Sequence, residues 1–212
     1  VFGLAGESGC GKSTVAFSLM RLHKPPAFIS GGQILFEGKD ILRLPDNELN
    51  TLRWSEIAMV FQSAMNSLNP VLTVQEQFAD VLRHHKGLTN EQAKDRAEKL
   101  LDLVNIPRNR LSEYPHQFSG GMRQRLVIAI ALSLNPKLII MDEPTTALDV
   151  VVQREILQQI YQLRDEFGFS VLFITHDLAL MSQLCDRIAI MRHGKIVEVN
   201  SSYEIRNHPQ HE

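Results

Sequence analysis

The segment that most constrains this chain is a glycine-rich loop near its beginning, Gly6-Glu7-Ser8-Gly9-Cys10-Gly11-Lys12-Ser13. An apolar stretch over 1–5 precedes it, and residues 13–22 carry apolar side chains at helical spacing. A glycine-rich turn between a buried strand and a helix directs successive backbone N–H groups into one concavity that suits an anion. Lys12 would reach the outer phosphates of a nucleotide, and the Ser13 hydroxyl would bind Mg²⁺. The loop therefore predicts a phosphate site at a helix N-terminus, where the helix dipole favours negative charge.

Composition limits the class of protein. The chain has 212 residues, enough for one large domain or for one domain with an inserted lobe. Its net charge of −2 provides no basic excess for binding nucleic acid or an anionic membrane surface. Two cysteines, Cys10 and Cys185, form no disulfide or zinc framework and favour a reducing, cytosolic compartment. No apolar run approaches the ~18 residues needed to cross a bilayer, and the opening residues are typical of a strand and not of a signal peptide.

Strand patterns occupy both ends of the sequence, and helical patterns occupy its middle. Strands are predicted at 32–38, 57–61, 138–141 and 171–174, a hairpin at 187–199 around His193-Gly194, and helices at 90–104, 119–134 and 152–167. Continuous apolar strands that alternate with helices indicate a mostly parallel sheet covered on both faces. Because a phosphate-loop strand ordinarily lies inside a sheet, we expect that the first strands of the fold are missing from this chain.

The same patterns predict the domain organisation. Residues 1–67 and 136–212 would form one α/β core, and residues 68–135 a helical subdomain inserted into it. Together they would make a single domain.

Polar side chains follow three of the predicted strands. Asp142 and Glu143 follow the strand at 138–141, Gln62 follows 57–61, and His176 comes shortly after 171–174. Ligands of open α/β sheets bind at the carboxyl ends of the strands, so these groups would face the phosphate loop. Asp142 suits a Mg²⁺ shell, and Glu143 could polarise an attacking water. The plainer alternatives are a solvated acidic turn, a loop-capping glutamine and an exposed histidine.

A second anion-binding pattern is Ser119-Gly120-Gly121, directly before a predicted helix. It combines a serine N-cap, two glycines and a helix dipole. An ordinary helix start is the alternative, but a cap gains little from two glycines, which instead leave the helix end open to an outside group. The chain is therefore expected to present two separate surfaces to ATP.

These residues occur in the order found in one family: the chain resembles the nucleotide-binding subunit of ABC transporters over essentially its whole length. The motifs that carry the resemblance are Gly6–Ser13 as Walker A, Gln62 as the Q-loop, Phe118-Ser119-Gly120-Gly121-Met122 as the signature motif, Leu138–Asp142 as Walker B with the catalytic Glu143 after it, Ala147-Leu148-Asp149 as the D-loop and His176 as the switch histidine. The resemblance implies the P-loop NTPase fold in its ABC ATPase form.

Within that family, the chain is most similar to the ATPase subunits of dipeptide, oligopeptide and nickel importers. The phrases that resemble this subgroup are 65–70, 114–118 and 142–150. The chain departs from the wider pattern at Met122, where many members have glutamine, although the peptide-importer subgroup often accepts Met there. The aromatic residue that stacks on adenine lies upstream of Walker A in this family, in a region this chain does not contain, and the C-terminal cysteine cluster of some peptide-importer subunits is not present.

The resemblance implies an ATPase that uses Mg²⁺. Nucleotide contacts carried over are Gly6, Glu7, Ser8, Gly9, Cys10, Gly11, Lys12, Ser13 and Thr14, with Ser119, Gly120, Gly121 and Asp149 at the partner's nucleotide. Ser13, Gln62 and Asp142 would hold the metal, while Glu143, His176, Lys12 and Gln62 would serve catalysis.

The resemblance also implies partners. A second ABC ATPase, homologous or identical, would pair head to tail with this chain. The pair would act on two membrane-spanning permeases at the cytoplasmic face of the plasma membrane, and indirectly on an extracytoplasmic solute-binding protein, with no nucleic acid involved.

Two other classes share part of this pattern. A soluble ABC-type ATPase acting on DNA or ribosomes would carry the same motifs, but DNA-repair relatives have long coiled-coil insertions, whereas 79 residues without sustained heptads separate Gln62 from Asp142. Translation-associated relatives usually have two such domains in one chain. A small-molecule or nucleotide kinase would leave Ser119–Met122 and His176 unexplained.

Overall fold

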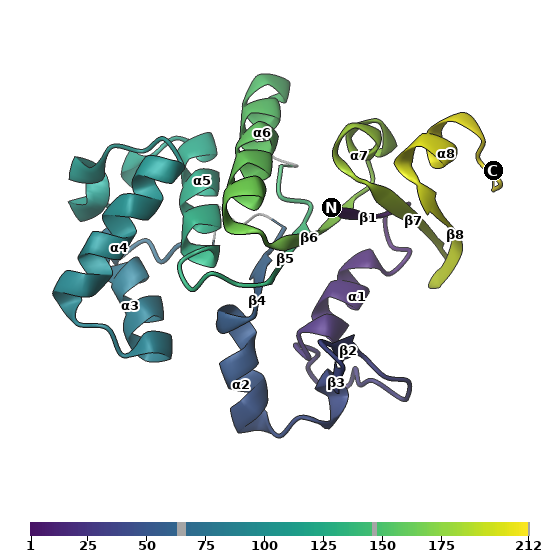
Figure 1. Cartoon of the computed structure of the whole chain (residues 1–212), viewed down its shortest axis with the longest axis horizontal. Coiled ribbons are helices and arrows are strands. Elements are labelled where there is room, and N and C mark those ends of the chain that lie inside the picture. Colours follow the sequence, from purple (N-terminus) through teal and green to yellow (C-terminus); the bar gives the residue numbers. More distant parts are fainter. Residues whose placement is uncertain (63–66, 146–147, 212) are drawn as a thin grey trace. The chain divides into compact units, whose positions relative to one another are not determined.

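The computed structural model describes residues 1–62, 67–145 and 148–211 (Figure 1). Met65 and Asn66 of the importer-like phrase, Thr146, and Ala147 of the predicted D-loop lie outside the described residues. The chain divides into two compact units, one formed by Val1–Arg53 with Val171–Glu212 and the other by Trp54–Ser170.

The first unit is built on four strands in the order β6-β1-β7-β8. β1 (Phe2–Gly6) pairs in parallel with both β6 (Ser170–Thr175) and β7 (Arg187–Arg192). β8 (Lys195–Ser201) returns antiparallel to β7. The predicted hairpin is confirmed, and its two turn residues, His193 and Gly194, both have left-handed backbone conformations, as the tight hairpin turn requires.

Short helices accompany these strands. α1 (Lys12–Leu19) follows β1, α7 (Leu178–Leu184) lies near β1, and α8 (Ser202–Asn207) lies near β7 and β8 (Figure 1). α7 approaches β1 closely, because a Cβ at Gly3 would lie 2.9 Å from the Cys185 sulfur at the end of that helix. A short helical turn, η1 (Ile41–Arg43), and α2 (Asp46–Ser55) complete the first half of the chain, and the second unit begins in the last turn of α2.

The predicted strand over 32–38 is mostly wrong. The structure has only β2 (Leu35–Phe36), which pairs with β3 (Lys39–Asp40) in a small hairpin. Glu37 and Gly38 both have positive φ and turn the chain back on itself, so the apolar run ends after two residues.

The second unit contains β4 (Ile57–Val60) and β5 (Leu138–Asp142), which pair in parallel with Val60 opposite Met141. Every residue of β4 is buried, in agreement with its continuous apolar pattern. Four α-helices of this unit carry the sites discussed below: α3 (Val74–Lys86), α4 (Asn90–Leu103), α5 (Gly120–Ala131) and α6 (Val150–Phe167). Two short turns, η3 (Arg108–Ser112) and η4 (Pro115–Gln117), lead into α5.

α3, α4 and α5 pack against one another (Figure 1). The limits of the predicted helical subdomain, 68–135, remain a prediction; these three helices all fall between them. None of the helices in the described ranges combines the length and apolar character needed to cross a membrane. The chain is thus an α/β protein with mostly parallel strand pairing, as predicted.

Candidate functional site

The glycine-rich loop connects β1 to α1 in the first unit. Gly9 and Gly11 have φ values of 80° and 108°, which side chains rarely adopt. Gly6 is required for a different reason, because a Cβ there would lie 2.2 Å from the Met191 carbonyl oxygen of β7. Around Gly9, by contrast, a Cβ would meet nothing within 4 Å. The loop is therefore held tightly at its base and is open at its tip.

Lys12 closes this loop. Its side chain is 6% exposed, and its Nζ donates to the carbonyl oxygens of Gly6 and Glu7, both at 2.8 Å. The ammonium also lies 3.9 Å from the Cys10 sulfur. The charge is thus fixed over the loop, within reach of an anion bound there.

The start of α1 fits such an anion. The helix begins after Gly11 without a side-chain cap, and its first turn carries no acidic residue. A helix N-terminus leaves several N–H donors without intrahelical partners. Here the sequence Lys12-Ser13-Thr14 offers them beside a lysine and a hydroxyl, which suits a phosphate with its Mg²⁺.

His176 lies at the same edge of the first unit's sheet. It follows Thr175, which stands opposite Ala5 in the parallel pair of β1 and β6. The side chain of His176 is exposed, and the turn after it is fixed because Asp177 N–H donates to Thr175 Oγ1 at 3.2 Å. The sequence predicts that His176 lies beside the phosphate loop, and the strand register brings the ends of β1 and β6, which precede these two segments, next to each other.

Gln62, Asp142 and Glu143 come together in the second unit. They follow the paired strands β4 and β5, and Gln62 Nε2 donates to Glu143 Oε2 at 3.4 Å. Asp142 is 3% exposed, and Glu143 is half-buried. Glu143 has a φ of 46°, a conformation that costs about 1–3 kcal/mol for a non-glycine residue and is found most often at functional sites.

The predicted metal ligands are distributed over both units: Ser13 lies in the first turn of α1, and Gln62 and Asp142 lie in the second unit. No group of three or more His, Cys, Asp or Glu side chains within 1–62, 67–145 and 148–211 could hold a metal ion by itself. A few protein oxygens fit Mg²⁺, which usually keeps water and substrate phosphates as its other ligands. Coordination by these three residues remains a prediction.

The start of α5 forms the second predicted surface. Ser119 is its N-cap, and the serine Oγ accepts from Met122 N–H at 3.3 Å. Gly120 and Gly121 form the first turn. A Cβ at Gly121 would lie 2.6 Å from Val152 Cγ1 of α6, so this glycine permits the close approach of the two helices.

Asp149 lies beside this surface. It is the N-cap of α6, and its Oδ1 accepts from Val151 and Val152 N–H at 3.1 and 3.0 Å. A pocket of about 390 Å³ joins the two helix starts. Its lining consists of Ser119, Gly120, Gly121, Met122, Arg125, Leu148, Asp149, Val152 and Glu155. The structure therefore brings the predicted signature motif and the described part of the D-loop into one hollow.

Three polar residues near this hollow were not predicted. Arg125 of α5 and Glu155 of α6 form an ion pair of 2.7 Å that ties the two helices together. Arg110 of η3 contacts the segment that leads into Ser119. No local motif points to them, because the partners of Arg125 and Arg110 are set by the packing of turns and helices.

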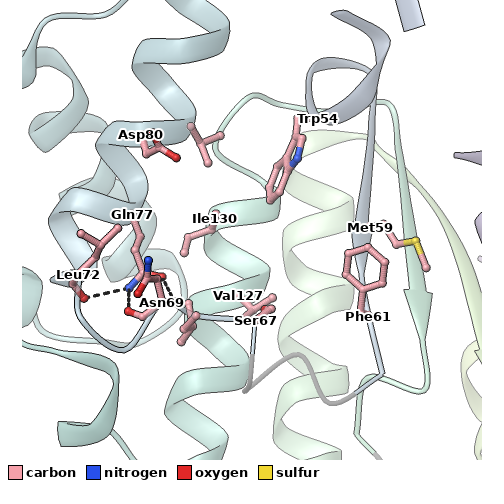
Figure 2. A pocket seen from close by; sticks show the side chains of 12 residues that line it. Trp54, Met59, Phe61, Ser67, Asn69, Leu72, Gln77, Asp80, Val127 and Ile130 are labelled. Carbon is pink, nitrogen blue, oxygen red and sulfur yellow. Dashed lines mark hydrogen bonds between the residues drawn. The ribbon is translucent and has the colours of Figure 1, made fainter. Parts of the chain in front are cut away.

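A second pocket, of about 250 Å³, lies elsewhere in the second unit (Figure 2). Figure 2 shows Phe61 after β4, Gln77 of α3 and Val127 of α5 among its lining residues. Gln77 is buried and fixes the 69–72 loop, since it donates to the carbonyls of Asn69 and Leu72 and accepts from Asn69 N–H. The pocket is mostly apolar, although Asp80 is among its lining residues. Phe61, which also lines it, directly precedes Gln62 in the sequence.

Comparisons with known proteins identify what the chain is similar to. A family model described as "ABC transporter" matches residues 1–146. The oligopeptide transport ATP-binding protein OppD of Bacillus subtilis (strain 168) is 48% identical over 211 residues, which cover 98% of this chain and 59% of that protein. The dipeptide transport ATP-binding protein DppD of the same strain is 46% identical over 213 residues, covering 99% and 64%. The chain thus spans about three fifths of the length of these curated relatives.

Solved structures give the same result for the fold. The ATP-binding cassette MJ0796, in a dimeric state bound to ADP and Pi, superposes with a TM-score of 0.80 at 31% identity, over 95% of this chain and 84% of that one. The structure of cbiO1 from Clostridium perfringens, part of the ABC transporter complex cbiONQ, superposes with a TM-score of 0.82 at 27% identity, over 98% and 79%.

Proposed function

The chain belongs to the ABC transporter family and has its ATPase fold, and from this premise we propose that it binds and hydrolyses ATP to drive an importer of dipeptides, oligopeptides or nickel. The observation that carries the proposal is that one chain holds two separate helix N-termini suited to phosphate. One is α1 behind the glycine loop, and the other is α5 behind Ser119. The names of OppD and DppD, which refer to peptide transport, support the choice of solute class.

In this proposal the first N-terminus holds the chain's own ATP. Lys12 Nζ exchanges its two backbone carbonyl partners for phosphate oxygens, and N–H groups from the loop and the first turn of α1 donate to the same phosphates. Ser13 would hold Mg²⁺ together with Gln62 and Asp142, the latter two mostly through water. When bound, Mg²⁺ neutralises charge on the phosphate oxygens.

Hydrolysis requires a base and an orienting group near the γ-phosphate. The Glu143 carboxylate accepts a proton from the attacking water, whose oxygen bonds to the γ-phosphorus as the bond to the β–γ bridging oxygen breaks. Gln62 lies within hydrogen-bonding distance of Glu143 and would help to orient that water. His176 would contact the γ-phosphate from the end of β6.

The second N-terminus would serve a second ATPase subunit, homologous or identical, paired head to tail. Ser119, Gly120 and Gly121 would face the ATP held by that subunit, and Asp149 would link the two sites. ATP binding would close the pair, and loss of the γ-phosphate would reopen it.

Closure would reach the membrane through the helical subdomain and the residues after Gln62. We assign the pocket of Figure 2 as the surface where a segment of a membrane-spanning permease docks, because it joins Phe61 next to Gln62 with α3 and α5. Two permeases at the cytoplasmic membrane face, and an extracytoplasmic binding protein beyond them, would complete the importer.

The ATPase part of the proposal is tested by Glu143→Gln. This variant should bind ATP with unchanged affinity and hydrolyse it at least ~100-fold more slowly, because a positioned base contributes on that scale. Phosphate release and nucleotide affinity measured on the same preparation separate the two effects. Near-normal turnover would remove Glu143 from this role.

The transport part is tested by affinity purification of the tagged protein from detergent-solubilised membranes. Recovery of multi-span permeases with a second ATPase is expected. Recovery of the protein alone, or with ribosomes or DNA, would leave the ATPase chemistry in place and overturn the importer.

A further inference from the structure

Arg110, in η3, contacts several residues of the segment 113–122, which leads into α5. Its Nε and Nη2 donate to Glu113 Oε2 at 2.9 and 2.6 Å, and Nη2 also donates to the Gln117 carbonyl at 2.9 Å. Nη1 donates to the Met122 sulfur at 3.4 Å. The guanidinium carbon lies 4.1 Å from the centre of the Phe118 ring, in cation–π geometry.

These contacts enclose the serine that caps α5. Gln117 and Phe118 directly precede Ser119, and the Met122 N–H donates to the Ser119 hydroxyl. One planar side chain therefore holds the chain on both sides of the cap. Removing it would release both sides together.

The far end of this arrangement is anchored in the helices. The Glu113 carbonyl accepts from Val74 N–H, at the start of α3, at 3.0 Å. Leu111 and Phe118 are both buried. The hydrogen bond from Arg110 lowers the pKa of the Glu113 carboxyl, and the same bond raises the pKa of Arg110, so both remain charged at neutral pH.

We propose that Arg110 is a positioning residue that sets the direction of the α5 N-terminus, and thereby how readily the Ser119 surface engages a second subunit's ATP. The inference rests on the function proposed above. Met122 belongs to the same arrangement, because its thioether lies where it accepts from the Arg110 guanidinium.

A role in stability alone is the competing explanation. The Arg110–Glu113 pair is partly exposed, with 24% and 29% of the two side chains accessible, and such pairs contribute little to the free energy of unfolding. Small errors in the direction of a reacting or binding group, in contrast, are costly to activity. The two explanations therefore predict different dimerisation and turnover for variants of Arg110.

Arg108 provides a matched control. It lies in the same short turn, η3, and its guanidinium pairs with the Asp102 carboxylate of α4 and not with the segment around Ser119. Arg108→Ala removes the same charge from the same turn, and it should leave dimerisation and turnover near the values of the unmodified protein.

Arg110→Ala should keep its ATP affinity within about twofold, because the glycine loop is untouched. In the Glu143→Gln background, its ATP-driven dimerisation should need at least about tenfold more protein, as expected for a misdirected contact surface. With Glu143 present, turnover at saturating ATP should fall by a similar factor without a change in KM for ATP. Arg110→Lys keeps the charge but loses the planar guanidinium, so its dimerisation and turnover should lie between those of Arg110→Ala and the unmodified protein.

Hydrogen exchange without nucleotide tests the positioning directly. The amides of 120–122 should exchange faster in Arg110→Ala than in Arg108→Ala, and Glu113→Gln serves as the test variant if Arg110→Ala does not fold. Equal exchange and equal dimerisation in the Arg110 and Arg108 variants would overturn the inference and leave the proposed function intact. An unmodified protein that neither dimerises with ATP nor hydrolyses it would overturn the proposed function, while the exchange data would still decide whether Arg110 positions the helix.

Discussion

The starts of α1 and α5 are both glycine-flanked helix N-termini, yet they are completed in different ways. α1 has no side-chain cap, and its own Lys12 bends back over the loop at 6% exposure. α5 is capped by the exposed Ser119, and Val152 of α6 packs closely against it at Gly121. At the first site, the ammonium of Lys12 donates to two backbone carbonyls, whereas Arg125, the cation that lines the hollow at the second site, is paired with the Glu155 carboxylate. This difference supports the proposal that α1 binds a ligand of this chain and that α5 contacts a ligand held by a second subunit.

Lys12→Ala should break the first site and spare the second. Loss of a charge-assisted hydrogen bond to phosphate costs about 1.5–3 kcal/mol, so ATP affinity should fall about 100-fold at the upper end of that range. Isothermal titration with Mg·ATP measures this directly, and hydrogen exchange at 120–122 should be unchanged. Lys24→Ala, which removes the same charge at an exposed position outside the glycine loop and α1, is the control and should lose far less affinity.

Ser119→Arg should produce the opposite result. The bulky cation would occupy the open end of α5, so ATP binding to the single chain should be retained while ATP-driven dimerisation is lost. The oligomeric state with and without ATP, measured by light scattering in the Glu143→Gln background, tests this. A variant that still forms the nucleotide-dependent dimer would disprove the assignment of Ser119 to the interface.

The glycines of the two sites should respond differently to alanine. Gly9→Ala has space for its methyl group but forces a left-handed conformation, at a cost of about 1–2 kcal/mol. Gly121→Ala has helical geometry but places its Cβ 2.6 Å from Val152 Cγ1, and such overpacking costs about 1–3 kcal/mol, reduced by alanine's helix propensity.

Urea denaturation of both variants alone and with Val152→Ala separates the two causes. Val152→Ala should recover part of the free energy of unfolding that Gly121→Ala loses, and it should recover none of the loss in Gly9→Ala. Equal responses would show that the close approach of α5 to α6 does not constrain Gly121.

The contrast also explains what could be predicted from sequence. The glycine loop, the buried strands 57–60 and 138–142 and the Ser119 cap are local features, and their residue types specify their geometry over a few positions. The strand predicted at 32–38 is too long, because Glu37 and Gly38 have positive φ and end the observed strand after Phe36.

Other features depend on contacts that no local pattern encodes. Arg125 and Glu155 are 30 positions apart and meet only because α5 packs on α6. The Arg110 contacts span 3 to 12 positions across two short turns that carry no helical periodicity. The left-handed backbone of Glu143 is likewise invisible in a sequence that reads as an ordinary acidic turn.

The smallest expected effect is the response of the α5 approach to acid. The Arg110 hydrogen bond lowers the pKa of Glu113 in the folded chain, so its contribution to stability is present above the unfolded pKa of about 4.3 and is lost as pH falls through the lower folded value. Lys12, in contrast, holds the phosphate loop through backbone carbonyls, which do not titrate. Below about pH 4.3, exchange at 120–122 should therefore rise before exchange in the loop at 7–11, after correction for intrinsic rates.

Glu113→Gln should remove that acid response, and Asp102→Asn provides its control. The hydrogen bond from Arg108 lowers the pKa of Asp102 as well, so Asp102→Asn should also flatten the acid side of the stability curve. Only Glu113→Gln should alter exchange at 120–122, because only Glu113 shares its arginine with the segment around Ser119. If both variants changed that exchange equally, the acid response would belong to the unit as a whole, and the two helix starts would differ less than their contacts indicate.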